Sequence, residues 1–410
     1  MNGFQRKRTL PVTRPIFIIF DLLMKKIVDE IINTLLGILS PDDVIPLHEP
    51  FFYGNEKKYI NDCIDTRFVS SIGAYVTQFE TLLAEFTGAK HVIATVNGTS
   101  ALHISLLMAG VRQGDEVLVP ALTFVATANA VTYCTATPHF IDSNPVTLGI
   151  DVEKLDHYLQ QNTRMENNIC INTTTLRPIR AIVPVHIFGT PVDMDPLMKI
   201  CNKFHLTLIE DAAESLGSYY KGTHTGTFGL CGALSFNGNK TITTGGGGAI
   251  LCNNEKIALQ AKHLTTTARL NNNFHYVHDQ TGFNYRMPNI NAAIGCAQIE
   301  QLPYFLKKKR KLAFKYINAF EPVKGVAIIN EPDYAKNNFW LNTLMLDKPD
   351  NKLLQTILER TNRMGIQTRP IWTLLHKLPM YKRCPSMELS CALELEDRVI
   401  NIPSSINLVD

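Results

Sequence analysis

The chain lacks a run of about 20 mostly apolar residues, which is the length that a membrane-spanning helix needs. Residues 16–20 are apolar and follow the basic residues 6–8, but Asp21 interrupts them and no small-residue cleavage site follows. The sequence therefore predicts neither a membrane span nor a secretion signal.

A strong excess of charge is also missing. Lysine and arginine total 40 against 37 acidic residues, which gives a formal net charge of +3. This balance is too even for the electrostatic footprint of a nucleic-acid-binding protein. We therefore expect a small-molecule partner and no nucleic acid, and we interpret the basic run at residues 307–310 as a solvated helix face.

Paired cysteine motifs are absent, because the nine cysteines are scattered singly and form no C-x-x-C pair. This pattern predicts reduced thiols that fill core space in the cytoplasm. The G-x-G-x-x-G string of nicotinamide-dependent oxidoreductases is missing as well. His275 and His278 have no second pair of ligands near them in the sequence, so we assign no metal.

The composition that remains is that of a globular protein with a sizeable core: 410 residues, 45% hydrophobic and 19% charged. We expect an N-terminal extension over residues 1–44, a large domain over 45–300 and a small domain over 301–410. Apolar residues at helical spacing predict an amphipathic helix over residues 25–36. Because Met24 opens this helix, we expect the residues before it to be an added start or a floppy arm.

Short β-branched runs alternate with helical stretches between residues 91 and 210, which predicts a mostly parallel sheet covered by helices. Asp195 precedes Pro196, a typical pattern for a capped helix start. The predicted strands cover residues 91–96, 116–119, 139–142, 181–185 and 206–209.

Three local patterns carry chemistry, and the first is Asn97-Gly98-Thr99-Ser100 between an apolar strand and a helical run. Free backbone N–H groups and the positive end of a helix dipole at such a turn suit a phosphate. The alternative interpretation is a plain helix N-cap with a glycine that eases the turn.

The second pattern is the apolar run 206–209, which ends in Glu210 and Asp211. Ligands of open α/β sheets gather at the carboxyl ends of strands, so Asp211 is a candidate site residue. A helix N-cap explains an aspartate at a strand end equally well, and both interpretations stay open.

The third pattern is Lys240, which follows Ser235-Phe236-Asn237-Gly238-Asn239 and precedes the four glycines at 245–248. Because a glycine run costs conformational entropy on folding, its presence suggests close approach of backbone and ligand. The alternative is an ordinary solvated lysine in a surface loop. Together, a phosphate-binding turn, a strand-end aspartate and a lysine beside glycines are the parts that pyridoxal phosphate requires.

Longer strings resemble a known family. Residues 96–102, 114–117, 120–127, 210–217 and 284–289 are similar to the DegT/StrS sugar aminotransferases, and the resemblance runs from about Ile45 to the end. It implies an α/β protein of the pyridoxal-phosphate-dependent transferase fold type I, which is aspartate aminotransferase-like. Such a protein has a large domain with a mostly parallel seven-stranded sheet and a small C-terminal α/β domain. It forms an obligate homodimer with sites at the subunit interface.

The resemblance also implies the role of each site residue. Lys240 would form the imine with pyridoxal 5'-phosphate and shuttle the proton, Asp211 would pair with the ring nitrogen, and Phe124 would stack on the ring, although Phe124 is equally a core residue. Further implied contacts are the phosphate ligands Gly98, Thr99 and Ser235, Asn284 from the neighbouring subunit, Glu214 near the phenolic oxygen, the sugar-nucleotide contact His376 and the donor-carboxylate residue Arg286. Asn284 as a turn residue and His376 as a surface loop residue remain alternatives.

Residues 45–50 and 185–196 look closest to the branch that acts on UDP-linked 4-keto-6-deoxy-N-acetylhexosamines, on routes to bacillosamine and legionaminic acid. This branch implies amino transfer from L-glutamate to C4 of the nucleotide-linked keto sugar. Alternatives are a GDP-4-keto-6-deoxymannose aminotransferase, that is a perosamine synthase, and a non-catalytic regulator with the same fold. A dehydratase relative would carry histidine in place of Lys240. Relatives usually continue into a closing helix where this chain stops at Asp410, so we expect a truncated end.

Overall fold

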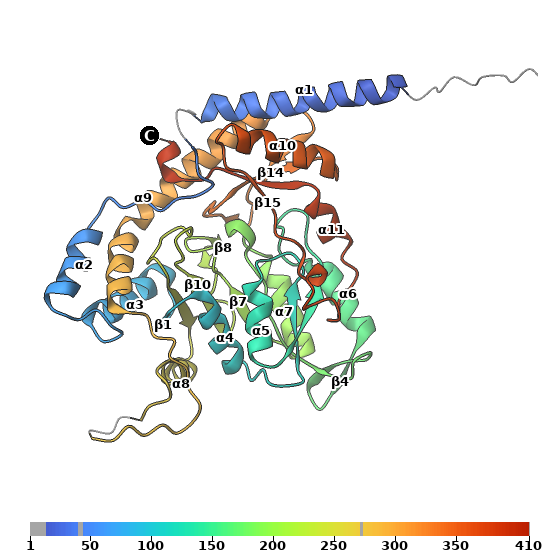
Figure 1. Ribbon diagram of the computed structural model, residues 1–410. Coiled ribbons are helices and arrows are strands. Elements are labelled where there is room, and N and C mark those ends of the chain that lie inside the picture. Colours follow the sequence, from blue (N-terminus) through green and yellow to red (C-terminus); the bar gives the residue numbers. More distant parts are fainter. Residues whose placement is uncertain (1–13, 40–43, 271–273, 410) are drawn as a thin grey trace, which may run out of the picture.

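The computed structural model describes residues 14–39, 44–270 and 274–409, and residues 1–13 of the predicted arm lie outside them. The fold is α/β with a large sheet at its centre and a smaller sheet above it in Figure 1. In this part of the chain no helix combines the length and apolar character that crossing a membrane requires.

The strands follow the chain as β1 (His91–Thr95), β2 (Glu116–Pro120), β3 (Thr137–Ile141), β4 (Thr163–Glu166), β5 (Ile169–Asn172), β6 (Pro178–Ile182), β7 (Thr207–Asp211), β8 (Tyr219–Tyr220), β9 (Thr223–His224), β10 (Cys231–Ser235), β11 (Gly248–Cys252), β12 (Val326–Ile328), β13 (Ala335–Lys336), β14 (Asn342–Leu346), β15 (Arg369–Pro370) and β16 (Val399–Ile402). The helices are α1 (Arg14–Ile38), α2 (Glu56–Asp65), α3 (Ala74–Thr87), α4 (Gly98–Met108), α5 (Ala126–Tyr133), α6 (Val152–Asn162), η1 (Ile187–Gly189), α7 (Met194–Phe204), α8 (Glu255–Thr265), α9 (Asn289–Phe320), α10 (Asn351–Arg363), η2 (Leu375–Lys377), α11 (Ser390–Glu396) and η3 (Ile406–Leu408).

The large sheet has the strand order β1-β11-β10-β7-β6-β2-β3, and the β4–β5 hairpin extends it beside β6. The pairs from β10 through β7, β6 and β2 to β3 are parallel, whereas β11 is antiparallel to both of its neighbours. The fold class is therefore confirmed, and the seven strands of this order are mostly parallel as predicted, whereas β4 and β5 bring the sheet to nine strands. β6 and β7 are shifted from their predicted ranges by one to three residues at each end.

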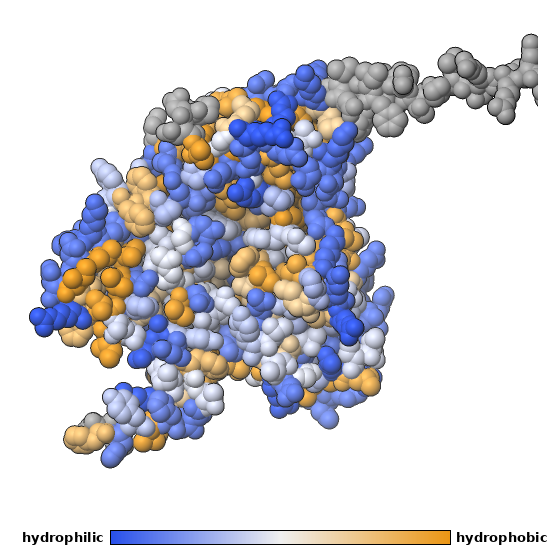
Figure 2. Space-filling model, viewed as in Figure 1, coloured by the Kyte–Doolittle hydropathy of each residue, from blue (hydrophilic) through white to orange (hydrophobic). Residues whose placement is uncertain are grey.

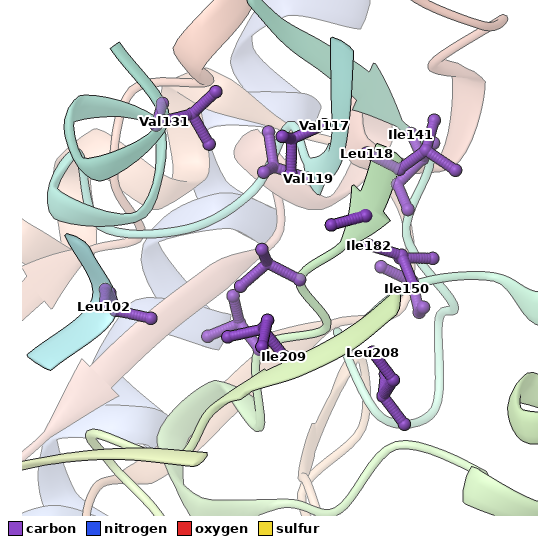
Figure 3. Packing of buried hydrophobic residues seen from close by; sticks show 14 of the residues in the cluster. Leu102, Val117, Leu118, Val119, Val131, Ile141, Ile150, Ile182, Leu208 and Ile209 are labelled. Carbon is purple, nitrogen blue, oxygen red and sulfur yellow. The ribbon is translucent and has the colours of Figure 1, made fainter. Parts of the chain in front are cut away.

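The core of the large sheet is built from strands that are mostly buried, and β2 and β11 are buried along their whole length, which explains their apolar runs. Figure 3 shows Val117, Leu118 and Val119 of β2 close to Ile182 of β6, with Ile209 on the neighbouring strand β7. Because parallel strands end at one edge of the sheet, this packing brings the loops after β1, β7 and β10 together.

A four-stranded sheet, β12-β14-β16-β15, forms the smaller part, and α9 connects the two sheets. The first half of α9 packs against α2 and α3, its second half contacts β12, and Pro303 lies within it. The proposed division between residues 300 and 301 lies inside this one helix. We propose the two sheets as the basis of the large and small domains.

Helix α1 lies across α9 and α10, at the top of Figure 1. Val28, Ile31 and Leu35 are fully buried there, and Arg360 pairs with Asp29 at 2.6 Å. The predicted amphipathic helix over residues 25–36 is therefore present, but it begins at Arg14. Asp21 interrupts an apolar run in the sequence without breaking a helix, because aspartate costs a helix interior only about 0.7 kcal/mol.

Two local predictions are wrong. The helix near Asp195 begins at Met194, with Asp193 at the N-cap position, and the Asp193 carboxylate accepts a hydrogen bond from the Tyr220 hydroxyl at 2.6 Å. The basic run at residues 307–310 is not a uniformly solvated face either, because Lys309 is 1% exposed. Helical periodicity places every third or fourth residue of such a run on the inner face.

The Lys309 ammonium group donates to two backbone oxygens, Trp340 O at 3.1 Å and Ser404 O at 2.9 Å. Both of these acceptors are uncharged, and burial lowers the pKa of Lys309 from its ordinary value of 10.5 to about 7. The folded protein therefore holds fewer protons on this group than the unfolded chain between about pH 7 and pH 10.5. Over that window the free energy of unfolding should rise with pH because of Lys309.

We expect Lys309→Met to lose this pH dependence. A difference of one bound proton between the folded and unfolded states changes the free energy of unfolding by about 1.4 kcal/mol per pH unit. Above pH 7, the free energy of unfolding of the wild type minus that of the variant should therefore rise by up to this amount per pH unit. Urea unfolding from pH 6.5 to 9.5 measures this difference. Lys307→Met, on the exposed side of the same turn, serves as the matched control, and a constant difference for Lys309→Met would contradict the prediction.

Candidate active site

A cavity of about 390 Å³ lies at the carboxyl edge of the large sheet, beneath the segment that leads into β14. Its walls come from the loops after β1, β2, β7 and β10 and from the small-domain residues Trp340 and Trp372. Seven of the predicted site residues line it, namely Gly98, Thr99, Phe124, Asp211, Glu214, Ser235 and Lys240. These seven residues, which lie up to 142 positions apart in the chain, thus meet in one cavity.

The first wall is the N-terminal turn of α4. Asn97 caps the helix, because its Oδ1 accepts the Ser100 N–H at 2.8 Å, and this cap is compatible with a phosphate at the same turn. Gly98 and Thr99 follow in the first turn, whose N–H groups have no partner within a helix. A Cβ atom on Gly98 would lie 2.9 Å from Ser235 Cβ, and one on Gly248 would lie 2.4 Å from the carbonyl carbon of Asn97. Only glycine allows these backbones to pack so closely.

Asp211 is the last residue of β7 and is 4% exposed. Its Oδ2 accepts the Thr127 hydroxyl at 2.8 Å, and its Oδ1 accepts the Ala213 N–H at 3.2 Å. Turns rather than a helix follow it, so Asp211 is not a helix N-cap. Burial raises the pKa of Asp211, while the two hydrogen bonds and the charge of Lys240 oppose this rise. A cationic group bound in the cavity would be well matched to this carboxylate.

Lys240 is not a solvated loop residue, because its side chain is only 14% exposed. Its Nζ lies 3.3 Å from Glu214 Oε1 and 3.8 Å from the centroid of the Trp340 ring. Burial raises the pKa of Glu214, and the neighbouring charge of Lys240 opposes that rise. The amine therefore faces the cavity between a carboxylate and an aromatic ring.

The Glu214 carboxylate is itself held by the backbone, since its Oε2 accepts the Phe188 N–H at 2.9 Å. Phe188 has φ 52°, a left-handed conformation that costs a bulky residue energy. Sequence reasoning gave no sign of this strained contact, because an apolar residue in η1 looks like ordinary core.

The cavity residues Trp340 and Trp372 were also missed, as was Thr127, whose hydroxyl donates to Asp211. The one signal that could have found the tryptophans is their rarity, since the chain has only two and both line this cavity. Trp372 lies 5.0 Å from Phe188 and 6.5 Å from Phe124 between ring centroids. Phe124 and Trp372 thus form an aromatic part of the cavity lining, with Phe188 packed against Trp372.

Three predicted residues do not line the cavity. Asn284 is exposed on a projecting arm formed by residues 266–270 and 274–285, which extends below α8 in Figure 1. Arg286 pairs through its backbone with Thr95, and its Nε is buried without a partner in the described part of the chain. His376 lies in η2, where its Nδ1 is likewise buried and unpaired among the described residues, and burial lowers its pKa.

The cavity contains the groups that pyridoxal phosphate needs: a helix N-terminus with a close-packed glycine for a phosphate, a buried carboxylate for a ring nitrogen, and an amine between them. A larger groove of about 690 Å³ lies between α6 and α7, and the ion pair of Lys203 with Asp156 forms part of its lining. None of the ten predicted site residues lines that groove. The smaller cavity is therefore the candidate active site.

Comparisons with known proteins agree with this site. Residues 53–410 match the DegT/DnrJ/EryC1/StrS aminotransferase family. The chain is 35% identical to the GDP-perosamine synthase of Caulobacter vibrioides over 89% of this chain and 94% of the relative. It is 36% identical to the GDP-perosamine synthase of Vibrio cholerae over 90% of this chain and 95% of the relative. Helicobacter pylori PseC, an aminotransferase of pseudoaminic acid biosynthesis, shares the fold with a TM-score of 0.80, 23% identity and coverage of 89% and 95%.

The matched region contains every residue that lines the cavity, and both curated relatives are covered almost completely. The chain therefore belongs to the DegT/DnrJ/EryC1/StrS aminotransferase family and is a pyridoxal-phosphate-dependent sugar-nucleotide aminotransferase.

Proposed function

We propose that this enzyme transfers an amino group from L-glutamate to C4 of GDP-4-keto-6-deoxymannose. The similarity to GDP-perosamine synthases at 35–36% identity over about nine-tenths of the chain supports a GDP-linked acceptor. The UDP-linked N-acetylhexosamine that the motifs at residues 45–50 and 185–196 suggested has no comparable support and becomes the second candidate. The observation that carries the chemistry is the Lys240 amine, held in one cavity with the Asp211 and Glu214 carboxylates.

Pyridoxal phosphate supplies, when bound, a ring that accepts electrons from the reacting carbon. We propose that Lys240 binds it through the side-chain amine and that Asp211 pairs with its ring nitrogen. Gly98 and Thr99 would hold the phosphate at the N-terminus of α4, with Ser235 beside them, and Phe124 would cover one ring face. These roles place the charged groups of the cofactor against groups of opposite polarity.

The same amine is suited to proton transfer. Once released from the cofactor, the Lys240 Nζ can take a proton from the donor amino acid and return one to the sugar carbon. The Glu214 carboxylate, 3.3 Å away, keeps the amine directed into the cavity. Arg286 and His376 stay proposals for binding the donor carboxylate and the sugar nucleotide, and each has one buried nitrogen with a free bonding position among the described residues.

We also propose a homodimer that works in the cytoplasm. Phe52, Tyr53, Ile64, Phe68, Val69 and Ile72 are exposed around α2 and before α3, where Figure 2 shows a broad apolar surface, and this set is called the α2 patch. Monomers rarely expose patches of this kind. Phe274 and Tyr276 are exposed on the projecting arm that carries Asn284, so a second copy could receive that residue at its own cavity. All nine cysteines are free thiols, as a reducing compartment requires.

Lys240→Ala should lower the rate of amino transfer by at least about 10²–10⁴-fold, because the variant lacks the amine that moves the proton. The visible colour of the bound cofactor should change as well, while the fold stays intact by circular dichroism. Lys203→Ala, a surface ion-pair residue, is the matched control and should keep full activity. A Lys240→Ala enzyme that turns over normally would refute the assignment, and a wild type that binds the cofactor without amino transfer would favour the regulator.

Incubation with L-glutamate and either GDP-linked or UDP-linked 4-keto-6-deoxy sugars tests the acceptor. We expect a new amine, detected by mass, from the GDP-linked 4-keto-6-deoxymannose, and a kcat/KM for the UDP-linked N-acetylhexosamine at least about tenfold lower, which corresponds to about 1.4 kcal/mol. A reversed preference would restore the UDP-linked sugar as the substrate.

Phe68→Asp places a charge in the α2 patch, where the native side chain is 54% exposed. If this surface holds the dimer together, the variant should become monomeric by light scattering and lose most of its activity, because Asn284 would no longer reach a partner's cavity. Leu176→Asp is the matched control, since Leu176 is 65% exposed outside the patch. A wild-type protein that is monomeric and active at assay concentration would contradict the proposal.

A further inference from the structure

The indole of Trp340 is packed directly on the cofactor lysine. Trp340 is 3% exposed, and its ring centroid lies 3.8 Å from Lys240 Nζ. A cation within about 6 Å of an indole face is attracted by the ring electrons, and the attraction is stronger in a site that excludes water. The ring therefore covers the side of the amine that Glu214 leaves open.

Three hydrogen bonds fix the position of this tryptophan. Its Nε1–H donates to the carbonyl oxygen of Asn239 at 2.7 Å, and Asn239 is the residue directly before Lys240. Its backbone N–H donates to Asn338 Oδ1 at 2.8 Å, and its carbonyl oxygen accepts from Lys309 at 3.1 Å. The indole is thus bonded to the backbone of the loop whose side chain it contacts.

Asn338 links the two groups that face the amine. Its Nδ2 donates to the carbonyl oxygens of Glu214 at 2.9 Å and Leu216 at 3.0 Å, while its Oδ1 holds Trp340. The carboxylate on one side of Lys240 and the ring on the other are therefore set by one buried amide. A shift of either wall would break bonds of Asn338, and because this side chain is 2% exposed the lost bonds would be costly.

From these contacts we infer that Trp340 is a positioning residue for Lys240, holding the lysine side chain against its ring face so that the amine meets the cofactor and the substrate in one orientation. The inference rests on the proposed role of Lys240. It assigns a function to a residue of the small domain, on the segment between α9 and β14. The ring contacts the Lys240 amine, and the Nε1–H group is hydrogen-bonded to the backbone of the loop that carries Lys240.

The chain makes this inference testable, because each tryptophan variant leaves one tryptophan in the cavity as a fluorescent reporter. Cofactor-free Trp340→Leu, Trp340→Phe and the control Lys203→Ala are compared with wild type. One measurement is the rate at which added pyridoxal phosphate is covalently captured, followed by its visible absorbance. The other is the affinity for pyridoxine 5'-phosphate, which has no aldehyde and cannot bond to lysine, followed by quenching of the remaining tryptophan.

We expect Trp340→Leu to slow capture by about tenfold or more, because an amine that is no longer held in one orientation attacks the aldehyde less often, with pyridoxine phosphate affinity within about threefold of wild type. Trp340→Phe keeps a ring face and should restore capture to within about threefold, and Lys203→Ala should change little. Capture at the wild-type rate in Trp340→Leu overturns the inference. So does a parallel fall of capture and analogue affinity, which would make Trp340 a wall of the cofactor cavity alone.

If Trp340→Leu does not fold, Trp340→Phe decides the question by itself. A tenfold slower capture rate in Trp340→Phe, which keeps a ring face, would contradict the importance of that face. Failure of the proposed function is distinguishable from failure of this inference. A wild-type protein that captures no pyridoxal phosphate removes the role of Lys240, whereas normal capture by wild type and by Trp340→Leu removes only the role of Trp340.

Discussion

The structure depends on the close contact between two backbone segments at the edge of the large sheet. A Cβ atom on Gly248 would collide with the turn at Asn97, and one on Gly98 would press on Ser235. Because both positions are glycine, the start of α4 can lie against the ends of β10 and β11. This contact brings the N-terminus of a helix and the loop of Lys240 into one cavity, and the remaining site residues are arranged around it.

Burying three ionisable groups in that cavity is costly, and the protein offsets the cost with specific partners. Asp211 receives a hydroxyl and a backbone N–H group, Glu214 receives the N–H group of a strained Phe188, and Lys240 faces Glu214 and Trp340. The raised pKa values of the two carboxylates show that burial still outweighs these partners. A cofactor that brings its own charges completes the balance.

Local sequence signals predicted the parts of the site that lie on short continuous motifs. Lys240 beside its glycines, Asp211 at a strand end and Gly98 in a helix start are all recognisable because each motif is read within ten residues. Trp340 could not be found in this way, since its contact with Lys240 spans a hundred positions and depends on how the two sheets are placed. The buried Lys309 was missed for the opposite reason: a run of four basic residues hides the one position that faces inward.

The proline within α9 has a mechanical consequence. Pro303 has no N–H group, so the helix loses the backbone bond to the carbonyl of residue 299, at a point between the half that packs on α2 and α3 and the half that carries Lys309. Helix α9 is therefore less stiff at Pro303 than an uninterrupted helix would be. Bending at this point would move Trp340 relative to Lys240, while the first turn of α4 on the large sheet would stay in place.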